Sequence, residues 1–87
     1  MDRPTLIEFP SDFPLKIMGL AVEGFAQEIA ELVVRHAPEF DAASMEMRPS
    51  KAGKYLSLTC IVRATSQAQL DGLYVALTVH PMVKVVL

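Results

Sequence analysis

The sequence predicts an α+β sandwich in which two helices cover one face of a four-stranded antiparallel sheet. Segments of alternating and of helical periodicity follow one another in the order strand, helix, strand, strand, helix, strand. Both helical segments have start or stop signals, and all six segments fit into 87 residues, which is enough for one hydrophobic core. This order is that of the ferredoxin-like βαββαβ fold.

Residues 1–12 contain two prolines and show neither period, so we expect an irregular N-terminal arm. Residues 13–87 are expected to form a single ferredoxin-like domain. The first strand covers residues 13–20, where Leu15 faces the core and Lys16 faces the other side.

Residues 23–37 have apolar side chains three and four positions apart, which is typical of an amphipathic helix, and Pro38 ends it. The second helix is predicted to begin at Ser66. There Ser66 can accept a hydrogen bond from the backbone amide of Gln69, whose side chain reaches back, as in a capping box. This helix is expected to stop near residues 80–81.

Residues 45–51 and 54–64 are predicted to form a hairpin joined by Ala52-Gly53. Residues 82–87 form the last strand, with Val83 and Val85 facing the core. The predicted core consists of the inward side chains of all six segments: Leu15, Ile17, Phe25, Ile29, Val33, Leu56, Leu58, Cys60, Val62, Leu70, Leu73, Leu77, Val83 and Val85.

Composition excludes several function classes. A net charge of -2 disfavours nucleic-acid binding, which usually requires a basic domain. No apolar run is long enough to span a bilayer, so we expect no membrane association. The single cysteine, Cys60, forms no internal disulfide, and with no secretory signal at the N-terminus we expect a cytoplasmic protein.

Four stretches in this order resemble the YbeD-like family of small bacterial proteins: residues 9–19 (FPSDFPLKIMG), 36–38 (HAP), 48–55 (RPSKAGKY) and 64–71 (ATSQAQLD). The resemblance implies a ferredoxin-like fold, similar to that of the ACT regulatory domains that bind amino acids beside metabolic enzymes. It implies no catalytic residues, because none is established for the family.

The residues themselves offer no catalytic signature. His36, Glu39, Asp41, His80 and Cys60 fit no tight metal-ligand spacing, so we expect structural roles for them and predict no metal and no cofactor. Cys60 is predicted to face the core, away from the exposed, electropositive setting that a reactive thiolate needs.

Basic residues gather on the predicted outward face of the sheet. Four of the eight Lys and Arg residues fall there, against one acid, Glu46: they are Lys16, Arg48, Arg63 and Lys84. Met18, Ile61 and Val86 are expected to form an apolar centre between them. The same pattern is also typical of an ordinary solvated sheet face. RNA binding through this face is disfavoured, because Tyr55 is its one aromatic residue.

The hairpin from Arg48 to Lys54 is a second candidate, since a basic loop with small residues can present amides and cations to a carboxylate or phosphate. A solvated turn would have the same sequence.

Two functional hypotheses follow. The first is a non-enzymatic regulatory or adaptor module that binds a protein partner, a second copy or a small anionic metabolite through its open sheet face, edge strand or basic hairpin. The second is a small enzyme or carrier subunit whose site a partner chain completes. The lack of a nucleophile–base pair favours the first. The candidate binding residues are Lys16, Arg48, Ser50, Lys51, Lys54, Tyr55, Arg63 and Lys84.

Overall fold

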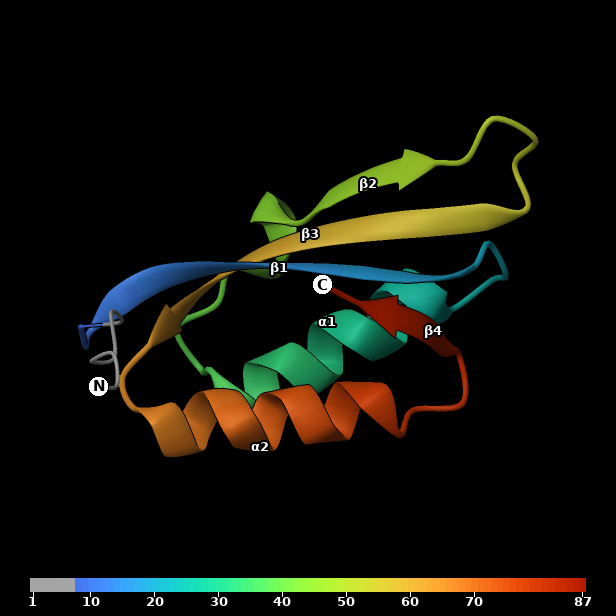
Figure 1. The fold of residues 1–87 in the computed structure, drawn as a ribbon. Coiled ribbons are helices and arrows are strands. Elements are labelled where there is room, and N and C mark those ends of the chain that lie inside the picture. The colour runs from blue at the N-terminus through green and yellow to red at the C-terminus, as the bar shows by residue number, and fades with distance from the viewer. Residues whose placement is uncertain (1–7) are drawn as a thin grey trace, which may run out of the picture.

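Two helices lie against one face of a four-stranded antiparallel sheet in the computed structural model, which describes residues 8–87 (Figure 1). The strand order is β2-β3-β1-β4, so the two longest strands form the middle of the sheet. The elements are β1 (Ser11–Leu20), α1 (Phe25–His36), a short 3₁₀ helix η1 (Ala42–Ser44), β2 (Glu46–Pro49), β3 (Tyr55–Ala64), α2 (Gln67–Thr78) and β4 (Val83–Val86). This architecture confirms the predicted ferredoxin-like α+β fold.

The central strands β1 and β3 pair in unbroken register, beginning with Ser11 opposite Ala64. The first strand therefore starts earlier than the alternation of the sequence predicted. The guanidinium of Arg63 donates to the carboxylate of Asp12 at 3.2 Å, which joins the two strands at this end. Residues 1–7 of the expected N-terminal arm lie outside the described residues, so the division into arm and domain stays a prediction.

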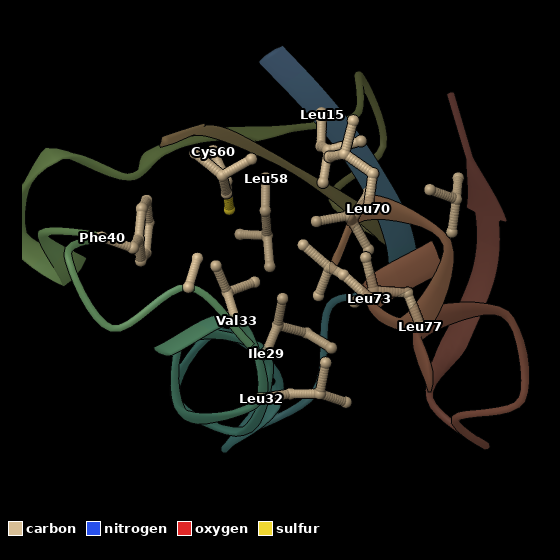
Figure 2. Packing of buried hydrophobic residues seen from close by; sticks show 14 of the residues in the cluster. Leu15, Ile29, Leu32, Val33, Phe40, Leu58, Cys60, Leu70, Leu73 and Leu77 are labelled. Carbon is tan, nitrogen blue, oxygen red and sulfur yellow. The ribbon is translucent and has the colours of Figure 1, made fainter. Parts of the chain in front are cut away.

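Side chains on the inner face of the sheet form one core with the two helices (Figure 2). Most of the predicted core residues are buried: Leu15, Ile17, Phe25, Ile29, Val33, Leu58, Cys60, Val62, Leu70, Leu73 and Leu77. Leu56 and Val83 are partly buried against this cluster. The core also includes residues outside the predicted core list: Leu32, which belongs to the apolar pattern of the first helix, and Ala37, Phe40, Ala64 and Val86.

The end of the last strand, after Val83, has the opposite phase to the one predicted. Val86 is 8% exposed and belongs to the core, whereas Val85 is 43% exposed. The cause is a bulge: Gly19 of β1 pairs with Val83, but the residue before Gly19 pairs with Val85, so Lys84 is an extra residue in β4. One extra residue exchanges the two faces for the rest of a strand.

Gly19 allows this close approach of β4. It is buried on the inner face of β1, and a Cβ atom at this position would collide with the carbonyl oxygen of Met82 and the ring of Phe25. A larger side chain would therefore displace both α1 and the start of β4.

The connection between β2 and β3 is a loop of residues 50–54, not the predicted two-residue turn. Ser50 ends the ladder, because its carbonyl accepts from the amide of Gly53 (2.9 Å) and its hydroxyl accepts from the amide of Tyr55 (3.0 Å). Gly53 has a φ of 78°, a left-handed conformation that glycine adopts without strain. Ser50 and Lys51, predicted in the strand, thus belong to the loop.

The predicted cap of α2 is confirmed. The hydroxyl of Ser66 accepts from the amide of Gln69 at 3.0 Å. The side chain of Gln69 accepts from the amide of Thr65 at 2.6 Å and donates to the carbonyl of His36 at 3.0 Å. One side chain therefore ties the start of α2 to the end of α1. Neither of these helices, the two α-helices of the described residues, is long and apolar enough to cross a membrane.

Prolines face outward on the edge strand β2 and on the part of β1 that β4 leaves uncovered. The amide of Ser50 points toward β3, so the preceding residue, Pro49, points away from it. Lys16 exchanges hydrogen bonds with Leu87 on the β4 side, so Pro14, two residues earlier, faces the same side beyond the end of β4. Each proline removes an N–H that an added strand would need, which disfavours strand addition at β2 and at the uncovered part of β1. The short edge strand β4 contains no proline.

Replacing the edge proline of β2 should promote self-association. Pro49→Thr restores an outward N–H on a strand whose side chains are all exposed. We expect the variant to form larger species in sedimentation velocity as its concentration rises. Pro81→Thr, which changes an exposed proline outside the strands, is the matched control. A Pro49→Thr variant that sediments like the wild-type protein would contradict the edge-protection argument.

Loss of the Ser66 cap should destabilise the domain. Ser66→Ala is expected to reduce the free energy of unfolding in urea by about 1 kcal/mol, since it removes the acceptor for the amide of Gln69. Ser66→Asp should recover most of the loss, because aspartate also caps helices. If Ser66→Asp is as unstable as Ser66→Ala, the cap does not act through this hydrogen bond.

Candidate binding face of the open sheet

The face of the sheet opposite the helices is open, and its outward side chains lie in rows across the strands β1, β3 and β2 (Figure 1). One row consists of Met18, Ser57 and Arg48, and the next of Lys16, Thr59 and Glu46. Because paired residues of neighbouring strands point to the same side, these six side chains form one continuous patch. We call it the open-face patch.

Two adjoining hollows lie over the open-face patch, with volumes of about 420 Å³ and 240 Å³. Lys16, Arg48 and Ser57 line both of them. The larger hollow is further lined by Glu46, Met47 and Thr59, and the smaller one by Met18, Pro49, Ser50 and Tyr55. The first is therefore polar and charged, whereas the second combines the same two cations with apolar and aromatic surface.

The two cations of the open-face patch have no carboxylate partner within the described residues. The ion pairs found in residues 8–87 join Arg63 to Asp12 and His80 to Glu28. Glu46 is the one acid that lines the hollows. The open-face patch thus has an excess of positive charge in a chain whose net charge is -2.

The structure brings together only part of the predicted binding set. Lys16, Arg48, Ser50 and Tyr55 line the hollows, and the ammonium of Lys54 lies 5.6 Å from the centre of the Tyr55 ring. Ser50 also has a structural task, because it closes the hairpin loop.

Three other predicted residues lie apart from the hollows. Arg63 is held by Asp12, because β1 starts early enough to place that acid opposite it. Lys84 occupies the bulge of β4, and Lys51 is exposed in the hairpin loop. Of the four cations predicted on the outward face of the sheet, Lys16 and Arg48 are therefore the two that line the hollows.

Two hydroxyl residues of the open-face patch, Ser57 and Thr59, were not among the predicted binding residues. The alternation of β3 does place both on the outward side, but only the register shows that they lie between the two cations. The apolar centre also changes: Val85, and not Val86, accompanies Met18 and Ile61 on this side of the sheet.

The cysteine and the two histidines have structural surroundings. Cys60 is buried in the core, and burial raises the pKa of its thiol to about 11, so the thiol stays protonated at neutral pH. The Nδ1 atom of His36 lies 3.2 Å from the carbonyl of Leu32, and Nδ1 of His80 accepts from the amide of Met82 at 3.1 Å. Within residues 8–87, no three His, Cys, Asp or Glu side chains are grouped so that they could hold a metal ion.

Comparisons with known proteins identify close relatives along almost the whole chain. A UPF0250 protein of Ralstonia nicotianae is 62% identical over 85 residues, which cover 98% of this chain and 88% of that protein. A UPF0250 protein of Janthinobacterium sp. is 61% identical over 83 residues, with 95% and 91% coverage. One from Nitrosomonas europaea is 52% identical over 87 residues, the full length of both chains.

The family model described as "Protein of unknown function (DUF493)" matches residues 4–87. The match agrees with the resemblance to the small YbeD-like bacterial proteins that the sequence motifs indicated. The chain therefore belongs to the DUF493 family, and the similar proteins named above are UPF0250 proteins.

Proposed function

We propose that this protein is a non-enzymatic adaptor module whose open-face patch binds an acidic segment of a protein partner. One observation carries the proposal: Lys16 and Arg48, which have no acidic partner within residues 8–87, line the same two hollows together with Ser57. Positive charge concentrated on one face of an acidic protein attracts an anionic group to that face.

The chemistry of the open-face patch suits a carboxylate. Lysine and arginine donate charge-assisted hydrogen bonds to carboxylate oxygens, and arginine can do so with two parallel bonds. The hydroxyls of Ser57 and Thr59 lie between the two cations and supply further donors. Glu46 disfavours a second negative charge at its end of the larger hollow, so the position of acidic side chains along a partner matters.

The shape of the face favours a protein segment over a small metabolite. Small-molecule sites enclose most of their ligand. Here the two hollows lie next to each other on an open sheet, and Met18, Ile61 and Val85 provide outward apolar surface along the same face. Such a mixture of apolar area and peripheral charge is typical of protein interfaces.

The edges of the sheet are less suited than the open face to binding a partner. Pro49 and Pro14 remove outward amides from β2 and from the uncovered part of β1, so a partner that adds a strand there would lose a hydrogen bond at each position. The remaining edge strand, β4, is only four residues long. The face therefore remains as the larger surface through which a partner can bind.

The surroundings of the nucleophilic side chains support a non-enzymatic role. The thiol of Cys60 is buried and protonated, and His80 is engaged by the amide of Met82 and the carboxylate of Glu28. Cys60 follows Thr59 in β3 but points to the opposite face, into the core, and His80 lies outside the strands, so neither supplies a base or nucleophile to the open-face patch.

Charge reversal at the open-face patch should abolish partner binding while the fold is retained. We expect Arg48→Glu to recover at least severalfold less of an acidic partner from a cell extract than wild-type protein does, since it replaces attraction by repulsion. Arg35→Glu is the matched control, because it makes the same change in net charge at an exposed position of α1. Circular dichroism checks that both variants are folded.

A pair of double variants separates the open-face patch from the hairpin loop. Lys16→Glu with Arg48→Glu should lose the partner, whereas Lys51→Glu with Lys54→Glu should retain most of it. Equal recovery by all variants would refute the proposal. Loss only in the hairpin variant would place binding at the loop. The partner can also be eluted with inorganic phosphate or with sodium chloride. If phosphate releases it at a much lower ionic strength than sodium chloride does, the open-face patch would instead be a site for a small anionic metabolite.

A further inference from the structure

A third hollow lies on the other side of β1, between its uncovered half and α2. Its volume is about 320 Å³, and its apolar lining comes mainly from Phe13, Leu15, Leu70, Tyr74 and Leu87. The hollow exists because β4 pairs only with the part of β1 around Ile17 to Gly19. Figure 1 shows β4 reaching the middle of β1, with the N-terminal half of α2 running below the half that β4 leaves uncovered.

The polar groups at this third hollow are mainly hydrogen-bond acceptors, and the side-chain amide of Gln67, a donor, is directed to Asp71. Asp71 is the one charged residue in its lining, and one of its carboxylate oxygens already accepts from the side-chain amide of Gln67 at 2.9 Å. The Asp71 carboxylate forms neither of the two ion pairs found within residues 8–87. No lysine or arginine lines the hollow.

The backbone at the rim adds to this acceptor character. Pro14 has no N–H, so it offers only its carbonyl on the side that faces away from β3. The hydroxyl of Tyr74 is 3.4 Å from the carbonyl of Val86 and directs its hydrogen there, which leaves its oxygen as an acceptor. An occupant with a positive charge and N–H donors therefore complements this hollow, and an anion does not.

We propose that this third hollow binds a small hydrophobic amine, with its apolar body against Leu15, Leu70 and Tyr74 and its ammonium group at Asp71. The volume is at the lower end of the range for small-molecule sites, which suits a ligand with one ring or a short alkyl chain. This site is independent of the open-face patch. The hollows share no lining residue, and they lie on opposite sides of β1.

The test is an NMR titration of the isotopically labelled full chain with three probes that share one aromatic body: 2-phenylethylamine, 2-phenylethanol and 3-phenylpropionate. We expect saturable shifts of the Leu15, Leu70 and Leu87 methyl signals with the amine. The amine should bind about two- to fivefold more tightly than the alcohol, which is the gain from one partly exposed ion pair, and the carboxylate should bind least. Added salt should reduce the difference between amine and alcohol.

Asp71→Asn should reduce the affinity for the amine to that for the alcohol, and the asparagine can still accept from Gln67. Glu39→Gln, which removes an exposed acid elsewhere, should leave the preference unchanged. Lys16→Glu with Arg48→Glu should also leave it unchanged, which separates this test from that of the adaptor role. Equal binding of amine and alcohol by the wild-type protein would overturn the proposal. So would an unchanged preference in Asp71→Asn, or the absence of saturable shifts at these three methyl groups.

Discussion

The register between β1 and β3 determines which side chains face the helices and which face solvent. Leu15 and Ile17 of β1 lie opposite Cys60 and Leu58 of β3 on the inner side, where they form the centre of the core (Figure 2). A shift by one residue would turn all of these toward solvent and bury Lys16. The same pairing that buries the core therefore also places the cationic and hydroxyl side chains on the open face.

The other elements define how much of the sheet remains available. Both helices pack on the inner face, and Gln69 links the start of α2 to the end of α1. Pro49 and Pro14 disfavour the addition of another strand at β2 and at the uncovered part of β1. Two surfaces then stand out as binding sites. One is the open face, where Lys16 and Arg48 lie among apolar and hydroxyl side chains, and the other is the hollow beside α2, which is lined mainly by hydrogen-bond acceptors. Their opposite charge character means that one ligand chemistry cannot satisfy both.

Much of the fold could be predicted because its long segments have strong periods. The alternation of β3 and the spacing in α1 identified most of the buried residues of both, and the Ser66 cap identified the start of α2. The phase of β4 could not be predicted, because a bulge at Lys84 depends on how closely the backbone approaches Gly19. A four-residue strand is too short for its own pattern to reveal such a shift.

The candidate site was predicted only in part for a similar reason. Alternation put Lys16, Arg48 and Arg63 on one face, but it could not tell which of them would meet an acid. Asp12 neutralises Arg63 because β1 extends to Ser11, beyond the start of its apolar alternation. Ser57 and Thr59 needed the register across three strands before they could be placed between the two cations.

The most direct measurement of the central claim is methyl cross-saturation NMR on the complex with an acidic partner. Irradiation of the partner should attenuate the methyl signals of Met18, Thr59, Ile61 and Val85, which lie on the outward side of the sheet. Those of Val34, Val75 and Val79, which are exposed on or beside the helices, should keep their intensity. Attenuation of the helix methyl groups with the sheet methyl groups unaffected would show that the partner binds elsewhere and would contradict the account.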